Sequence, residues 1–260
     1  MDAISGGAAG GKLAVEAVKF GVRRGWFRRL TDAFRKKHRV FVLGSTGAGK
    51  TNFLLSLRKE SPTAISHLDR TEFVMSHTLD IGGNLFAFVD TPGQPGQESR
   101  RSQAIRSMPR LKTTGVINVV SYGYHEYRRG SAGIVGAGGS IDGAFLAERR
   151  EVEIAALSEW LPVLGSIHTI DWMITLVTKA DLWWDRRDEV LEHYTSGAYG
   201  RALESVRELS PSAIEYCSVI HKFYGESVLP GIFDEGNKAQ LRDRMLRALI
   251  AAVGQGDHRE

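Results

Sequence analysis

The segment with the clearest chemistry is the glycine-rich run at residues 44–51, GSTGAGKT, which fits the pattern GxxxxGK[ST] in full. Glycines in this pattern let successive backbone N–H groups surround phosphate oxygens, and the lysine adds a cation to the outer phosphates. The hydroxyl of the last residue, Thr51, can bind Mg²⁺. The predicted phosphate-binding residues are Gly44, Ser45, Thr46, Gly47, Ala48, Gly49, Lys50 and Thr51.

A second candidate group is the carboxylate of Asp90, which stands forty residues after Lys50 in the sequence DTPGQ. The apolar run at residues 85–89 predicts a strand that delivers Asp90 beside the phosphate loop, where it would hold Mg²⁺ through water. Gly93 has no side chain, so its N–H can approach the γ-phosphate and sense its presence.

The third motif, TKAD at residues 178–181, follows an apolar run that predicts a buried strand. Such a position lies at the carboxyl edge of a parallel sheet, where ligands bind. Asp181 can accept hydrogen bonds from the N1–H and exocyclic amine of guanine, which adenine does not present, and the stem of Lys179 can lie across the ring. Together with Thr178, these residues favour GTP over ATP.

The elements needed to position these motifs are predicted from apolar periodicity. The predicted strands are residues 39–43, 71–79, 84–90, 115–121, 170–178 and 213–218, with a hairpin turn at 81–83. One helix is predicted directly after Thr51. Further helices are predicted at residues 147–161, 186–193, 202–209 and 238–253. Alternating strands and helices indicate an α/β fold, with a mainly parallel sheet and helices on both faces.

The three motifs in this order resemble the translation-factor-related P-loop GTPases, and their spacings most resemble Ras-like and Arf-like small GTPases. The resemblance covers residues 39–253 apart from a glycine-rich insertion. It implies hydrolysis of GTP to GDP and phosphate with Mg²⁺, in which Gln94 orients the attacking water and Lys50 stabilises charge. The segment YCSV at residues 216–219 resembles the loop that meets guanine O6, which implies that Ser218 and Val219 contact the base.

Two features depart from the resembled pattern. Thr178 occupies the position where the family most often has asparagine. The family also needs a threonine that binds Mg²⁺ only when the γ-phosphate is present. Thr71 lies nineteen residues before Asp90, a spacing like that of Arf proteins, and we predict it to be this ligand. Thr63 is the alternative.

The domain organisation follows from composition. We predict a flexible tail with a basic amphipathic helix at residues 1–38, a GTPase domain at 39–254 and a short tail at 255–260. Residues 128–143 contain six glycines and are interpreted as a flexible insertion. A second phosphate loop is the other reading of this segment, but no lysine accompanies it.

Positive charge is concentrated near the N-terminus. Residues 12–39 hold ten Lys/Arg against two acidic residues, a net charge of +8, while the whole chain carries +4. The folded body is therefore not expected to bind nucleic acid. A helix at residues 12–37 with an aromatic face and a basic face would suit either an anionic membrane surface or a protein, and the pattern does not choose between them.

The composition indicates the class of protein and the compartment in which it is expected. Hydrophobic residues make up 42% and charged residues 25%, as in folded soluble domains, and Cys217 is the only cysteine, so no intrachain disulfide can form. No apolar run approaches membrane-spanning length. We expect a cytoplasmic protein, neither secreted nor membrane-spanning, or one held peripherally on the inner face of a membrane.

The sequence is compatible with three functions. The first is a GTP-hydrolysing switch that works with an effector or a GAP-like partner. The second is a nucleotide-gated scaffold or assembly module with little turnover, in which the chain associates with itself. The third is a P-loop ATPase in which TKAD is a coincidence. Gln94 favours hydrolysis over mere binding, and TKAD disfavours the ATPase.

Overall fold

The structure, a computed structural model, describes residues 37–57, 75–91, 98–125, 134–135, 141–205, 209, 211–220 and 233–256. Apart from Lys37, these residues belong to one unit that spans residues 38–260. Several predictions fall outside the described residues. They are the helix at 12–37 except its last residue, most of the insertion at 128–143, and the site residues Thr63, Thr71, Gly93 and Gln94.

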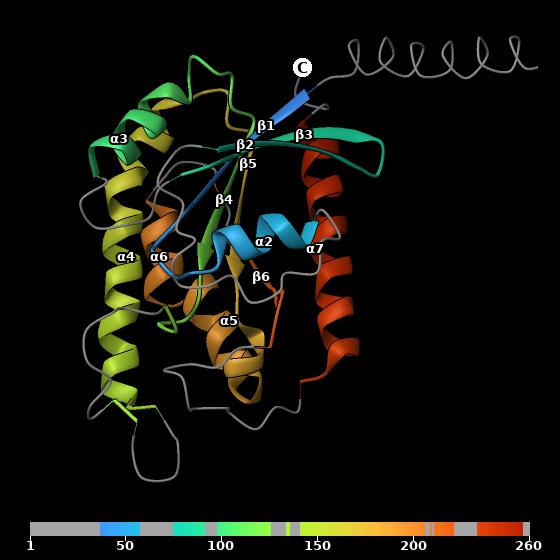
Figure 1. Cartoon of the computed structure of the whole chain (residues 1–260). Coiled ribbons are helices and arrows are strands. Elements are labelled where there is room, and N and C mark those ends of the chain that lie inside the picture. The colour runs from blue at the N-terminus through green and yellow to red at the C-terminus, as the bar shows by residue number, and fades with distance from the viewer. Residues whose placement is uncertain are drawn as a thin grey trace, which may run out of the picture. The chain divides into compact units, whose positions relative to one another are not determined.

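A six-stranded sheet forms the centre of this unit, in the order β2-β3-β1-β4-β5-β6 (Figure 1). The pairs β1–β4, β4–β5 and β5–β6 are parallel, while β2 and β3 are antiparallel. The strands are β1 (Lys37–Gly44), β2 (Met75–Ile81), β3 (Asn84–Asp90), β4 (Gly115–Val120), β5 (Trp172–Val177) and β6 (Ala213–Glu215). The predicted mainly parallel α/β sheet is confirmed.

The hairpin between β2 and β3 turns on two glycines. Ile81 pairs with Asn84, so only Gly82 and Gly83 form the loop, and their φ angles are 58° and 88°. Two consecutive left-handed residues are required by the hairpin turn whose twist matches that of the strands, and glycine adopts them without steric cost. The hairpin expected from the sequence is confirmed, and it delivers β3 to the edge of β1.

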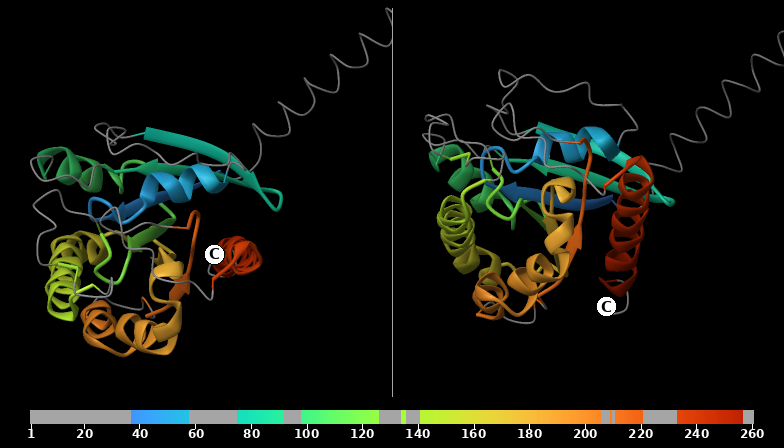
Figure 2. Two further views of the ribbon diagram at one scale, coloured as in Figure 1. Left: turned by 60° about the horizontal axis from the view of Figure 1, so that its bottom comes forward. Right: turned by 90° about the horizontal axis from the view of Figure 1, so that it is seen from below.

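Alternating side chains of the strands build two cores, one on each face of the sheet. Val40 and Val42 of β1 pack with α2 (Lys50–Leu57) and α7 (Glu235–Gly256). Phe41 and Leu43 pack on the opposite face. The helices that contribute most to that second core are α3 (Glu98–Ser107), α4 (Gly143–Ser166), α5 (Arg187–Thr195) and α6 (Ala198–Glu204), and Leu241 of α7 joins them. Figure 2 shows α2 and α7 on one side of the sheet and α4, α5 and α6 on the other, so helices cover both faces as predicted.

Three helices differ from what the sequence predicted. Helix α3 was not predicted, because its sequence ESRRSQAIRS is polar; among those of its side chains that the structure describes, Ala104 and Ile105 are the ones buried in the core. Helix α4 is longer than the predicted 147–161, since Asp142 caps its start and the helix continues through Pro162. Residues 202–209 were predicted as helix, but α6 covers Ala198–Glu204.

Glu215 anchors β6 between two helices. Its carboxylate is 4% exposed and accepts hydrogen bonds from Arg187 of α5 at 2.5 Å and from Arg244 of α7 at 2.9 and 3.0 Å. Burial alone would raise the pKa of Glu215, but a backbone hydrogen bond and the two arginines outweigh burial, so the pKa is lowered from 4.5. This anchor fixes the strand that leads directly into residues 216–219.

We expect Glu215→Gln to lower the free energy of unfolding at pH 7 by about 1.5–3 kcal/mol, the value of hydrogen bonds to a charged group. A lowered folded-state pKa stabilises the protein above pH 4.5, and this stabilisation is lost as the pH falls through the folded value. The difference in stability between wild type and variant should therefore shrink on acidification. Urea unfolding between pH 7 and pH 3 would measure this.

The matched control is Glu235→Gln in α7, because Glu235 is 73% exposed and pairs with Lys238 at 2.5 Å. An exposed pair is expected to change stability by less than about 1 kcal/mol. A Glu215→Gln variant that unfolds like this control at every pH would contradict the proposed anchor.

Candidate functional site

The phosphate loop connects β1 to α2, and its shape depends on glycine. Gly44, Gly47 and Gly49 have φ angles of 141°, 76° and 100°, which residues with a side chain rarely adopt. At Gly44 a Cβ atom would lie 2.3 Å from the carbonyl oxygen of Val119 in β4. The backbone of the neighbouring strand therefore passes too close for any other residue, and the loop curls as the GxxxxGK[ST] pattern predicted.

Lys50 is buried at the start of α2, with 7% of its surface exposed. Its ammonium donates hydrogen bonds to the carbonyl oxygens of Gly44 at 2.7 Å and Ser45 at 3.0 Å. A buried cation at a helix N-terminus inside a loop of left-handed glycines is suited to phosphate oxygens. The residues present therefore fit a nucleoside triphosphate.

Thr178 links the end of β5 to the phosphate loop. Its hydroxyl lies 2.5 Å from the carbonyl oxygen of Ala48 and 3.0 Å from that of Val120, and the residue is 4% exposed. One hydroxyl hydrogen can satisfy one carbonyl at a time, so the contact is shared between them. The position where the resembled family most often has asparagine thus holds a side chain that still bridges the phosphate loop and the TKAD motif.

The rest of the TKAD motif is fixed by its neighbours. Lys179 has a left-handed backbone with φ of 58°, and its ammonium donates to the carbonyl oxygen of Tyr124. The backbone N–H of Ala180 donates to the Tyr216 carbonyl at 3.2 Å. The Cys217 thiol shares its one hydrogen between the Asp181 carboxylate at 3.2 Å and the Val219 carbonyl at 2.9 Å.

The YCSV segment consequently lies against the TKAD motif. Burial and the neighbouring carboxylate raise the pKa of Cys217, so its thiol remains a donor at neutral pH. Ser218 and Val219, which follow in the chain, are partly exposed. The contact of Ser218 and Val219 with the base stays a prediction.

Asp90 ends β3 beside β1, its neighbour in the sheet. Its carboxylate is 1% exposed, and the next residue, Thr91, donates from its hydroxyl to the Val42 carbonyl at 2.9 Å. Thr51 occupies the first turn of α2 and is partly buried. A carboxylate and a hydroxyl at the ends of adjoining elements are oxygen ligands of the kind that Mg²⁺ prefers.

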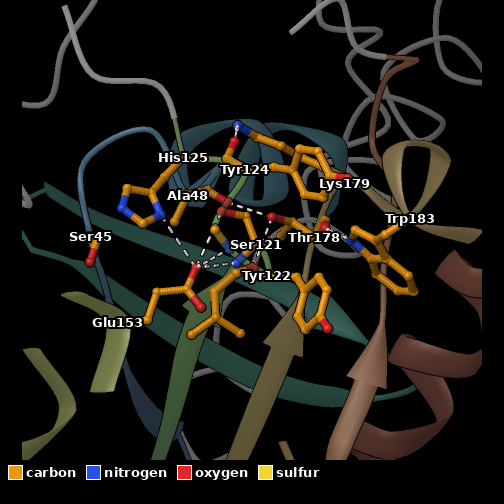
Figure 3. A network of polar contacts seen from close by, with 12 residues as sticks. Ser45, Ala48, Ser121, Tyr122, Tyr124, His125, Glu153, Thr178, Lys179 and Trp183 are labelled. Carbon is orange, nitrogen blue, oxygen red and sulfur yellow. Dashed lines mark hydrogen bonds and ion pairs between the residues drawn. The ribbon is translucent and has the colours of Figure 1, made fainter. Parts of the chain in front are cut away.

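A buried polar network that the sequence did not predict surrounds the chain after β4 (Figure 3). Glu153 of α4 is 3% exposed and accepts hydrogen bonds from the backbone N–H groups of Ser121 at 2.9 Å and Gly123 at 3.3 Å. Its other oxygen accepts from the Tyr194 hydroxyl at 2.5 Å. The only sequence signal was a carboxylate at a helical position shared with apolar residues such as Leu157.

We expect Gly44→Ala to abolish nucleotide binding, because the added methyl group would displace either the loop or β4. The free energy of unfolding should fall by about 1–3 kcal/mol, as for other overpacked interior sites. Equilibrium binding of a fluorescent guanine nucleotide and urea unfolding would measure both effects. Gly143→Ala is the control, since a Cβ there meets nothing within 4 Å and binding should be unchanged.

We expect Thr178→Val to weaken nucleotide binding while preserving side-chain shape. The loss leaves the Ala48 carbonyl without this donor, which costs about 1–3 kcal/mol in a buried position. Thr178→Ser, which keeps the hydroxyl, should bind nearly as well as wild type. Equal binding by the valine and serine variants in a titration would show that the bridge does not matter.

Part of the chain is similar in sequence to known GTPases. Residues 39–136, which include the phosphate loop, β3 and β4, match a family model described as 50S ribosome-binding GTPase. A 95-residue stretch is 33% identical to the tRNA modification GTPase MnmE of Porphyromonas gingivalis (strain ATCC BAA-308 / W83). The match takes in 35% of this chain, and the chain spans only 20% of that relative's length.

A solved structure of the mammalian SRP receptor is also similar, at 15% sequence identity and a TM-score of 0.45. That match covers 70% of this chain and 92% of the receptor chain. The phosphate-loop geometry and the sequence matches agree, although they do not specify the Ras-like or Arf-like group. Residues 39–136 resemble a GTPase domain, and this similarity supports a P-loop GTPase.

Proposed function

We propose that this protein binds GTP, hydrolyses it to GDP and phosphate, and acts as a nucleotide-dependent switch. The observation that carries the proposal is the hydroxyl of Thr178, 2.5 Å from the Ala48 carbonyl, which joins the phosphate loop to the guanine motif. The two halves of a guanosine nucleotide would thereby be recognised by one connected structure. The lysines of both halves, Lys50 and Lys179, are buried and hydrogen-bonded.

In the proposed reaction, water attacks the γ-phosphate in line with the leaving β-phosphate oxygen. Lys50 stabilises charge on the transferring group. Thr51 and Asp90, with Thr71, would hold Mg²⁺, which would supply positive charge to the phosphates when bound. Gln94 would orient the water, a role that rests on the family resemblance.

The switch itself would be read through the segments that hold Thr71 and Gly93. Contacts to the γ-phosphate keep such segments ordered in related GTPases, and hydrolysis removes these contacts. We propose that an effector or a GAP-like protein recognises this difference. Self-association is a second way in which nucleotide state can be read.

The basic segment at residues 12–37 suggests where the protein works. Each basic residue close to an anionic membrane surface contributes about 1 kcal/mol to binding. We propose a cytoplasmic protein that associates peripherally with the inner face of a membrane through this segment. Among the described residues, no helix is both long and apolar enough to cross a membrane.

The role of the matched relative does not extend to this chain. The matched relative is named for tRNA modification, but this chain spans only a fifth of that protein's length. The positive charge that might attract nucleic acid is confined to residues 12–39, and the rest of the chain is net negative. The proposal is therefore limited to the GTPase reaction and its use as a switch.

The first test is binding and hydrolysis of GTP and ATP with Mg²⁺. Lys50→Ala should weaken GTP binding by about 2–5 kcal/mol, because a buried charge contact to phosphate is lost. Gln94→Leu should preserve binding and slow turnover by on the order of 100-fold, as for other proton-transfer and water-orienting groups. Gln103→Leu, at an exposed position of α3, is the control for this substitution.

The test of base preference is Asp181→Asn, which should weaken GTP binding roughly 100-fold and improve binding of xanthosine triphosphate. Asp185→Asn is the matched control, because Asp185 is exposed four residues farther along the chain. Tight ATP binding that Asp181→Asn leaves unchanged would refute guanine recognition and leave the ATPase alternative. GTP binding with no turnover in any condition would favour the scaffold alternative.

A further inference from the structure

The backbone that follows β4 adopts an uncommon conformation. Tyr122 and Gly123 have φ angles of 53° and 82°, so two consecutive residues are left-handed. A Cβ at Gly123 would lie 2.5 Å from the Leu146 carbonyl oxygen of α4. A tyrosine in this region is strained, and such conformations persist only where the surroundings determine them. Residues 121–125, the β4 loop, therefore need a partner that holds them.

Glu153 is that partner. It receives the N–H groups of Ser121 and Gly123 directly, and the intervening N–H of Tyr122 donates to the Tyr194 hydroxyl at 2.8 Å, which itself donates to Glu153 at 2.5 Å. Three successive N–H groups of the β4 loop thus reach one carboxylate. The Nδ1 atom of His125 lies 3.4 Å from the same carboxylate.

The carboxylate of Glu153 is held in its charged form. Burial alone would raise the pKa of Glu153, but the contact with His125 and the hydrogen bonds from Tyr194 and Ser121 outweigh burial and lower the pKa. A charged acceptor binds backbone N–H groups more strongly than a neutral one. The β4 loop is consequently organised around a negative charge that belongs to α4.

On its other side, the β4 loop contacts the guanine motif. The carbonyl oxygen of Tyr124 accepts a hydrogen bond from the ammonium of Lys179, whose own backbone is left-handed. The Tyr124 hydroxyl accepts from Arg186 at 3.0 Å, so this residue is held at both ends. Figure 3 shows the contact between the Tyr124 carbonyl of the β4 loop and Lys179.

We propose that Glu153 is a positioning residue for guanine recognition: by holding the β4 loop, it sets the carbonyl that receives Lys179 and thereby the course of the Lys179 stem across the base. This inference rests on the proposed function. It differs from a role in fold stability alone, because it requires the effect of Glu153 on nucleotide binding to pass through Lys179.

A double-mutant cycle on the full chain tests this dependence. Glu153→Gln keeps the shape of the side chain but removes its charge, and Lys179→Met keeps an apolar stem but removes the ammonium. Binding of a fluorescent GDP analogue should weaken roughly 2- to 30-fold in Glu153→Gln, the range for residues that act through a packed network. In the Lys179→Met background, the same change should weaken binding less than about twofold.

Two comparisons separate base positioning from general damage. Competition by inorganic tripolyphosphate, which reports on the phosphate loop alone, should be the same in wild type and Glu153→Gln. Glu148→Gln, an exposed position of α4, should bind GDP like wild type. An equal loss from Glu153→Gln in both Lys179 backgrounds, or a parallel loss of tripolyphosphate binding, would overturn the proposal.

A second variant covers the case in which Glu153→Gln does not fold. Tyr194→Phe removes only the hydroxyl that joins Glu153 to the Tyr122 N–H, and it should give a smaller loss with the same dependence on Lys179. An effect of Tyr194→Phe that is unchanged by Lys179→Met would refute the proposal. Failure of the wild-type protein to bind GDP would instead refute the proposed function itself.

Discussion

The contact between the Thr178 hydroxyl and the Ala48 carbonyl joins two segments that are 130 residues apart in the chain. It exists because β1, β4 and β5 are parallel neighbours, so the loops that follow them leave the sheet at the same edge. Without this shared edge, the phosphate loop and the TKAD motif would be unrelated peptides. With it, they form adjoining parts of one site.

The same edge concentrates charged groups that are removed from water. The buried groups are Lys50, Asp90, Glu153, Lys179 and Asp181. A buried charge is costly unless it is paired or hydrogen-bonded. Backbone carbonyls meet this requirement for Lys50 and Lys179, and the N–H groups of the β4 loop meet it for Glu153. Side chains held in this way need little rearrangement when a nucleotide arrives, and low rearrangement favours binding.

Much of the framework was predictable because its signals are local. The β1–loop–α2 unit and the β2–β3 hairpin follow from glycine positions and apolar patterns within short windows. Helix α3 gave no such signal, since few of its residues are buried. The start and length of α4 depended on the Asp142 cap and on buried side chains such as Trp160. Element boundaries of this kind are decided by packing partners elsewhere in the chain.

By itself, the sequence determined the phosphate-loop and TKAD patterns from which phosphate binding and guanine recognition are predicted, because glycine spacing and the TKAD order are properties of the chain. Only the tertiary structure showed that Glu153 holds the β4 loop and that Thr178 bridges the two motifs. Both contacts join residues distant in sequence through the parallel sheet. A buried glutamate and a threonine are ordinary residues in a linear pattern, and only their partners in three dimensions distinguish them.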